Sequence, residues 1–269
     1  MKTRIISALI MLPLLLFLYF GGIPLLCITF LMSLIAMSEL YKGFESIDIH
    51  PIKWMGYVSL VCLYAIIVWG EFLVNEQKVY AHLLCMWIVG NVLMGLLITL
   101  FRKGNPIADG TITSLAALYI GFFLCHIPLI SRISKYDKMV WIVFLCAFGA
   151  DIFAYFTGYF FGKHKLCPEI SPKKTVEGAI GGVLGSMLLC GIFGYFIYPD
   201  EFLHCLIIGA FGSVFSMLGD LIASVFKRKM GIKDYGNLIP GHGGVLDRFD
   251  SVIFTAPFVY YYILVIMRP

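Results

Sequence analysis

Residues 224–250 read Ser-Val-Phe-Lys-Arg-Lys-Met-Gly-Ile-Lys-Asp-Tyr-Gly-Asn-Leu-Ile-Pro-Gly-His-Gly-Gly-Val-Leu-Asp-Arg-Phe-Asp and lie between two apolar runs, 202–226 and 251–267. A helix needs roughly 17 to 25 apolar residues to cross a bilayer, and both runs meet that length. The polar segment between them holds three Asp, five basic side chains, one His and five Gly. Glycine and proline permit tight turns and close approach to a ligand. The cations suit phosphate, and Asp247 and Asp250 offer hard oxygen ligands for Mg²⁺. The stretch therefore predicts phosphate and metal chemistry at a membrane surface.

The composition of the whole chain also indicates a membrane protein. Of its 269 residues, 60% are apolar and 13% are charged, whereas about a quarter of the residues of a soluble domain are charged. We predict an all-α, polytopic integral membrane protein, a single membrane domain of about nine transmembrane helices. The expected spans are Ile5 to Phe20, Ile23 to Leu40, Trp54 to Gly70, Tyr80 to Phe101, Ile112 to Ile130, Met139 to Gly162, Ala179 to Tyr198, Phe202 to Phe226 and Ser251 to Met267.

The spans divide into an N-terminal group, spans 1–5 in residues 1–138, and a C-terminal catalytic group, spans 6–9 in residues 139–269. The polar site is expected at the cytoplasmic ends of the C-terminal helices. The first span could instead be read as a cleavable signal peptide, but it lacks a clear small-x-small cleavage site and eight further spans follow.

Basic residues are distributed unevenly between the two sides of this topology. With nine spans, 15 of the 20 Lys and Arg residues share one side, and only Lys78, Arg132, Lys135, Lys138 and Arg268 lie opposite. Lys and Arg in short loops concentrate on the cytoplasmic side, so the segment 224–250 is expected to face the cytoplasm. The net charge of +4 reflects this asymmetry and does not indicate a nucleic-acid partner.

Two carboxylates are predicted at membrane depth, where an ionisable group is costly enough to indicate function. Asp220 shares one helix face with Ser216, Ser224 and Lys227, because the four residues are spaced by four, four and three. We expect Asp220 to share a metal ion with Asp247. A polar stripe that joins helices is the structural alternative. Asp151 is the second acid, in span 6.

A basic loop follows span 6 and contains Ser171-Pro-Lys-Lys-Thr-Val-Glu-Gly178. Pro172 predicts a helix start after Ser171, and a helix N-terminus that carries Lys173 and Lys174 would bind anions. The alternatives are that these lysines only mark topology and that Thr175 and Glu177 are capping groups. Further along, Gly178, Gly181, Gly182 and Gly185 predict close helix packing. Glu39, at the end of span 2, is expected at the membrane interface.

Two segments carry a family resemblance. Ser224, Lys227-Arg228, Lys233-Asp234, His242-Gly243-Gly244 and Asp247-Arg248-x-Asp250 resemble the signature of the phosphatidate cytidylyltransferases, and Ser171 to Gly178 resembles a second element of that family. The resemblance implies an integral-membrane enzyme of phospholipid biosynthesis. It would join CTP to phosphatidate with a divalent cation and give CDP-diacylglycerol and pyrophosphate.

The resemblance and the chemistry of the side chains together assign the expected site. The catalytic candidates are Asp220, Asp247, Lys227, Arg228, His242 and Arg248. The substrate-binding candidates are Ser171, Lys173, Lys174, Thr175, Ser224, Lys233, Asp234, Gly243, Gly244 and Asp151. Mg²⁺ is expected on Asp220, Asp247 and Asp250, with a second cation left open. The expected partners are CTP, phosphatidate and the lipid bilayer, in a bacterial-type cytoplasmic (inner) membrane; homo-oligomerisation is left open.

Two other functions compete with this interpretation. Another membrane lipid-phosphate transferase would also use acids and lysines at the membrane edge, although the Asp-Gly-x-x-Ala-Arg signature of the CDP-alcohol phosphotransferases is absent from the sequence. An ion-coupled transporter could use Asp151 and Asp220 as coupling sites. Transport does not require the Gly-His-Gly-Gly turn, and no inverted repeat is evident.

Overall fold

Long apolar helices make up nearly all of the computed structural model, which describes residues 16–72, 77–238, 241 and 243–268. The N-terminal group contains α2 (Gly22–Glu45), α3 (Lys53–Phe72), α4 (Gln77–Phe101), α5 (Pro106–Ala116), the π-helical turn η1 (Ala117–Phe122) and α6 (His126–Ser131). The C-terminal group contains η2 (Asp137–Met139), α7 (Val140–Phe161), β1 (Lys165–Cys167), β2 (Ser171–Thr175), α8 (Val176–Ile197), η3 (Pro199–Glu201), α9 (Phe202–Lys229), α10 (Leu246–Tyr262) and η4 (Ile263–Met267).

Eight helical segments in the described residues are long and apolar enough to cross a membrane. They correspond to the second to ninth predicted spans, so the polytopic all-helical fold is confirmed. Most of the first predicted span falls outside the described residues. The part of it that is described, residues 16–20, is helical.

Two local expectations were wrong, and one confirmed span is less regular than a single α-helix. The fifth span is one helical segment that can cross a membrane, but the π-helical turn η1 interrupts it between α5 and α6. The last helix begins at Leu246 and not at Ser251, so the Asp247-Arg248-x-Asp250 end of the polar segment is helical. Ser171–Thr175 is a β-strand, antiparallel to β1, and the helix starts at Val176, four residues later than the start that Pro172 predicted.

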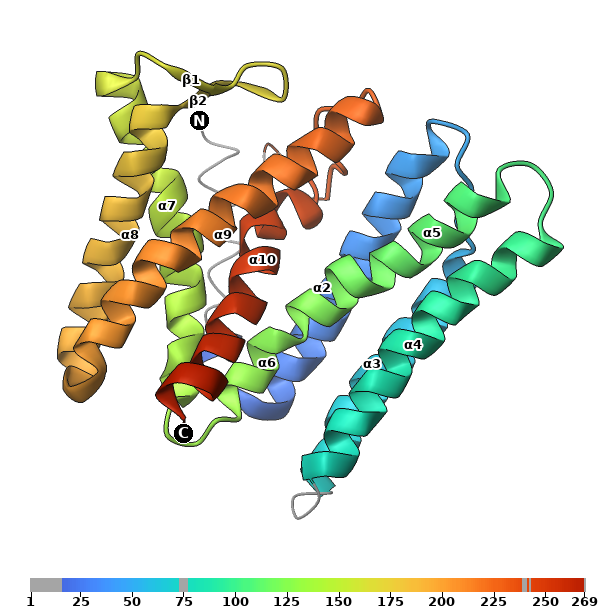
Figure 1. The fold of residues 1–269 in the computed structure, drawn as a ribbon, viewed down its shortest axis with the longest axis horizontal. Coiled ribbons are helices and arrows are strands. Elements are labelled where there is room, and N and C mark those ends of the chain that lie inside the picture. Colours follow the sequence, from blue (N-terminus) through green and yellow to red (C-terminus); the bar gives the residue numbers. More distant parts are fainter. Residues whose placement is uncertain (1–15, 73–76, 239–240, 242, 269) are drawn as a thin grey trace.

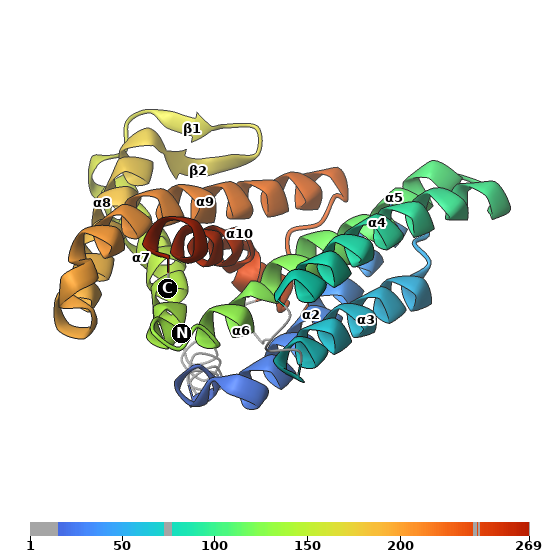
Figure 2. The same ribbon diagram turned by 60° about the horizontal axis from the view of Figure 1, so that its bottom comes forward.

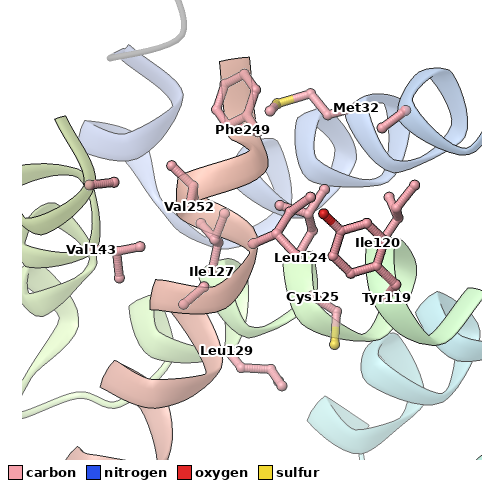
Figure 3. Close-up of a cluster of buried hydrophobic side chains, with 14 of the residues drawn as sticks. Met32, Tyr119, Ile120, Leu124, Cys125, Ile127, Leu129, Val143, Phe249 and Val252 are labelled. Atoms are coloured by element: carbon pink, nitrogen blue, oxygen red, sulfur yellow. The ribbon is translucent and has the colours of Figure 1, made fainter. Parts of the chain in front are cut away.

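The two groups of helices meet around α10. Figures 1 and 2 both place α7, α8 and α9 on one side of the molecule and α3, α4 and α5 on the other. Figure 3 shows the contact between the groups: Phe249 and Val252 of α10 lie among side chains of α2 and of the segment from η1 to α6, including Met32 and Leu124. Val252 and Leu124 are almost wholly buried. Helix α10, which carries part of the polar segment, is therefore held by both groups.

Small residues bring α7 and α8 close together, as predicted. A Cβ at Gly178 would lie 2.9 Å from the carbonyl oxygen of Ala154, and one at Gly182 would lie 2.9 Å from that of Ala150. Membrane helices gain little from burying apolar surface against each other, so close backbone packing is a main source of their association. Either glycine could accept a side chain only if the two helices moved apart.

The four basic connections lie at one end of the bundle. The loops after α2, α4, α7 and α9 are all at the upper end in Figure 1, whereas the turns after α6 and α8 and the C-terminus are at the lower end. This arrangement agrees with the alternation that the charge pattern predicted. It brings the β-hairpin and the polar segment to the same end of the molecule.

Candidate active site

A cavity of about 660 Å³ opens among α7, the β-hairpin, α8 and α9. Its polar lining includes Asp151 from α7, Lys173 and Lys174 from β2, and Asp220 from α9. Figure 2 shows the hairpin lying over the ends of α7 and α8, and lysines of both hairpin strands line the cavity. Three segments that are distant in sequence thus contribute opposite charges to one hollow.

Hydrogen bonds at the N-terminus of α8 hold the hairpin in this position. Thr175 is the N-cap residue of α8, and its hydroxyl accepts a hydrogen bond from the Gly178 backbone N–H at 3.1 Å. Glu177, in the first turn, accepts hydrogen bonds from the backbone N–H groups of Lys163 at 3.0 Å and of His164 at 3.2 Å. These bonds tie the end of α7 to the start of α8. The capping alternative for Thr175 is therefore confirmed.

The Lys174 ammonium pairs with the Asp220 carboxylate, with Nζ 2.6 Å from Oδ2. The two side chains line the cavity and are about a quarter exposed, at 26% and 27%, although the Lys174 Nζ atom itself is buried. The hydroxyl of Ser224, one helical turn further on, lies 3.4 Å from the other carboxylate oxygen of Asp220. The predicted face of α9 is thus formed, and a lysine of the hairpin balances its acid.

Asp247 lies in a separate, tighter set of contacts. Its Oδ1 accepts from the Lys227 ammonium at 2.9 Å, and its Oδ2 accepts from the backbone N–H groups of Tyr235 at 2.8 Å and Gly244 at 3.0 Å. Gly243 takes a positive φ of 86°, which an L side chain adopts only with strain. Burial raises the pKa of Tyr235 well above its usual value, so this phenol stays neutral and donates to the Ala223 carbonyl at 3.0 Å. The carboxylate of Asp247 thereby organises the turn that precedes α10.

Asp250 connects this turn to the cavity. It is buried, and it interacts electrostatically with Asp220, Lys227 and Asp151. The Ser251 hydroxyl bridges two of these acids, lying 3.4 Å from Asp151 Oδ2 and 3.5 Å from Asp250 Oδ1. Three carboxylates from three different helices, Asp151, Asp220 and Asp250, are therefore grouped together, with cationic side chains near them.

The other predicted residues differ in burial and in their contacts. Arg228 is exposed, and its Nε donates to the Ile170 carbonyl of the hairpin at 3.3 Å. The Nε of Arg248 is buried with no hydrogen-bond partner in the described part of the chain, and Arg248 interacts electrostatically with Asp151. Lys233 and Asp234 are exposed, and neither of them lines the cavity. Ser171 is half-buried in β2, and His242 lies outside the described residues.

Sequence reasoning missed three residues of this region. Glu39, expected at the membrane interface, is 6% exposed and accepts hydrogen bonds from Val245 and Leu246, a role that the sequence did not predict. Lys165 of β1 lines the cavity, and only its place in a basic loop pointed to it. Tyr119 has a buried hydroxyl without a hydrogen-bond partner among the described residues, and it interacts with Asp250 and Asp220. No signal in the sequence distinguished Tyr119 from the other aromatic residues of its span.

The acids of this region are of the type that a magnesium ion binds. Mg²⁺ prefers carboxylate oxygens, water and substrate phosphate. Asp220 supplies a carboxylate to the cavity wall, and the buried Asp250 interacts with it electrostatically. Within the described residues no group of three or more His, Cys, Asp or Glu is arranged to hold a metal ion. Both oxygens of Asp247 already accept hydrogen bonds. The acids are thus of the chemical type that a hard cation prefers, but the described residues do not form a metal site from protein ligands alone.

Comparison with known proteins assigns the family. A family model described as "Cytidylyltransferase family" matches residues 2–266. The chain belongs to the cytidylyltransferase family. A relative named "Phosphatidate cytidylyltransferase" from Bacillus subtilis (strain 168) is 36% identical over 267 residues, which cover 97% of each chain. A relative of the same name from Staphylococcus epidermidis is 34% identical over 260 residues, covering 95% of this chain and 94% of that protein.

A third protein of that name, from Synechocystis, is 47% identical over 128 residues, or 47% of this chain and 43% of that protein. The predicted family resemblance is therefore confirmed over nearly the whole chain. This member of the cytidylyltransferase family is also a multi-pass membrane protein, because eight of its helices can span a bilayer.

Proposed function

We propose that this chain transfers the cytidylyl group of CTP to phosphatidate, giving CDP-diacylglycerol and pyrophosphate at the cavity between α7, α8 and α9. The chain is thus a phosphatidate cytidylyltransferase, a nucleotidyltransferase of phospholipid biosynthesis, as are the relatives that align with it from end to end. The observation that carries the proposal is the cavity itself. It places Lys165, Lys173 and Lys174 beside Asp151 and Asp220 at the end of a membrane bundle, which suits phosphate groups presented at a bilayer surface.

The cations around the cavity would bind the phosphates of both substrates. Lys173 is exposed at the cavity wall, and Lys174 can exchange its contact with Asp220 for a phosphate oxygen. The Nε atom of Arg248 is buried and has no hydrogen-bond partner within the described residues, so it can donate to a substrate. A guanidinium can bind two phosphate oxygens at once. Arg228 anchors the hairpin through Ile170. We assign these residues to phosphate binding, together with Lys227, which also holds Asp247 in place.

Asp220 and Asp250 are the proposed holders of Mg²⁺, with Asp247 beside them. When bound, the ion would neutralise charge on the phosphates of CTP and make the pyrophosphate a better leaving group. The protein's own part is to position these carboxylates. Ser224 and Lys174 orient Asp220, and Ser251 orients Asp250 through its backbone N–H at 2.8 Å.

The reaction balances without a protein base. A phosphate oxygen of phosphatidate forms a bond to the α-phosphorus of CTP while the bond from that phosphorus to the bridging oxygen of the β-phosphate breaks. Pyrophosphate takes the electron pair of the broken bond. Phosphatidate is already an anion at neutral pH, so catalysis consists of positioning and charge neutralisation. His242, in its Gly-rich turn, is proposed to donate to a phosphate oxygen.

The lipid would keep its acyl chains in the bilayer during the reaction. Tyr155 and Tyr159 of α7 line the cavity and are also exposed on the surface of the bundle, in the way that tyrosines mark the interface of membrane proteins. The charge asymmetry supports a cytoplasmic position for the cavity, where CTP is available. We therefore propose a bacterial cytoplasmic membrane location with the site facing inward.

The test is an assay of the purified protein with labelled CTP, phosphatidate and Mg²⁺, scored for a lipid-soluble cytidine product. Wild type is expected to form this product, and Asp220→Asn is expected to retain less than about a tenth of its rate, a loss above roughly 1.4 kcal/mol. Asp200→Asn is the matched control, because Asp200 is an exposed acid of η3 at the opposite end of the same span. Its rate should equal that of wild type.

Three results would contradict the proposal. Transfer of a lipid phosphate without CTP would favour another lipid-phosphate transferase. Ion uptake by proteoliposomes without a cytidine product would favour a transporter. Full activity of Asp220→Asn at saturating Mg²⁺ would remove this residue from the metal site.

A further inference from the structure

Glu39 is a buried carboxylate contributed to the site by the N-terminal group of helices. It lies near the C-terminal end of α2 and is 6% exposed. Its Oε1 accepts a hydrogen bond from the Val245 backbone N–H at 3.0 Å, and its Oε2 accepts one from the Leu246 N–H at 2.8 Å. Both oxygens thus bind the first residues of α10, which follow more than two hundred positions later in the chain.

The polar segment is shaped around this carboxylate. A Cβ at Gly244 would lie 2.5 Å from both carboxylate oxygens of Glu39, and a Cβ at Gly236 would lie 2.7 Å from Oε1. A methyl group at either position would therefore collide with the carboxylate unless Glu39 moved. The side chain of Glu39 in α2 therefore leaves no room for a side chain at Gly236 or Gly244 of the polar segment.

Glu39 takes the place of a helix cap. The first N–H groups of a helix have no partner within the helix and are usually satisfied by a side chain that precedes it. The N-cap residue of α10, Val245, has no side chain that can do so. A carboxylate at this helix end is also favoured by the helix dipole, which offsets the repulsion from nearby Asp247.

The capped turn carries the groups that the reaction uses. Asp247 lies in the first turn of α10, and the Gly244 N–H that binds its Oδ2 precedes this turn directly. We propose that Glu39 is a positioning residue for cytidylyl transfer: it fixes the first turn of α10, so that Arg248 and Asp250 keep one orientation toward the substrate phosphates and Mg²⁺. This inference rests on the proposed function. It gives the N-terminal helices a role in the reaction beyond anchoring the protein in the bilayer.

Glu39→Gln is the first test, because it preserves volume and replaces one acceptor oxygen with an amide NH₂. One of the two backbone donors then faces another donor and is left unsatisfied. We expect kcat to fall ten- to hundredfold, or about 1.4 to 2.7 kcal/mol, while KM for CTP and for phosphatidate changes by less than about threefold. The matched control is Glu45→Gln on the same helix, because Glu45 pairs with Lys53 at the surface; its kcat should be that of wild type.

Chemical rescue is the second test. A cavity of about 430 Å³, lined by Glu39, Lys42, Tyr57 and Gly236 among others, gives small solutes a path to this position. In Glu39→Ala, sodium formate should restore part of the lost kcat, whereas sodium chloride at the same ionic strength should not. A merely structural role predicts a lower melting temperature without rescue of turnover by formate.

Each remaining outcome is decisive. Wild-type kcat in a folded Glu39→Gln protein would overturn the proposal, as would a loss confined to KM. If Glu39→Gln and the charge-preserving Glu39→Asp both fail to fold, Glu39 is a folding determinant and the proposal fails. A wild-type protein that makes no lipid-soluble cytidine product would overturn the proposed function itself, which is a separate result.

Discussion

The ion pair between Lys227 and Asp247 offers a quantitative test of how the site is held together. Its Nζ and Oδ1 atoms are 2.9 Å apart, and only 12% and 2% of the two side chains are exposed. Removing one member of a buried pair leaves an uncompensated charge, which typically costs 3 to 5 kcal/mol. In Lys227→Met, Asp247 keeps its two backbone donors, so we expect a loss near the lower limit, about 3 kcal/mol.

The double variant Lys227→Met/Asp247→Asn should be much less destabilised than the sum of its parts. It removes both charges, and the asparagine oxygen can still accept from a backbone N–H group. We expect a coupling free energy of about 2 kcal/mol, within the range found for residues in direct contact. The assay is reversible unfolding of the detergent-solubilised protein by denaturant, followed by circular dichroism.

A surface pair provides the comparison for this cycle. Lys53 and Glu45 are 2.8 Å apart but 38% and 34% exposed, so Lys53→Met should cost less than about 1 kcal/mol. Additivity of the Lys227 and Asp247 single variants to within about 0.5 kcal/mol would refute the reasoning, because it would mean that the two charges do not depend on each other.

The other predictions concern the hairpin, the helix cap and the orientation. Lys174→Gln should lower kcat/KM about ten- to hundredfold through loss of a charge-assisted contact, and unchanged kinetics for both substrates would remove this lysine from the site. Thr175→Ala should destabilise the protein by about 1 kcal/mol through loss of the α8 cap, measured by thermal unfolding; an unchanged melting temperature would argue against the cap. With Cys167 replaced by serine, an impermeant thiol reagent should label Asn237→Cys only from the cytoplasmic side and Ser134→Cys only from the outside, and the reverse pattern would invert the topology.

Much of the fold could be predicted because the bilayer leaves few alternatives. An apolar run of sufficient length is expected to become a helix, since a helix makes all of its backbone hydrogen bonds within its own segment. The element boundaries were harder to predict. The start of α10 at Leu246 depends on a cap from Glu39, which lies in another part of the chain. The strand at Ser171–Thr175 depends on pairing with β1, whereas local propensity at Pro172 favours a helix start.

The site shows the same division between local and long-range information. The face of α9 that carries Asp220 and Ser224 follows from helical spacing, and the structure confirms it. The partner of Asp220 could not be read from spacing, because Lys174 reaches it from a hairpin. The acceptor role of Asp247 toward backbone N–H groups depends on a turn whose shape is a property of the folded chain.

The link between Glu39 and α10 also sets an order on biosynthesis. Its two ends are separated by 206 and 207 residues. A ribosome adds about 5 to 20 residues per second, so Glu39 is made roughly 10 to 40 s before its partners. During that interval α2 must enter the membrane with a carboxylate that has no helix to cap. The cap therefore forms only once α10 is inserted, and a chain that stops short of α10 has neither the cap nor the turn that the cap holds.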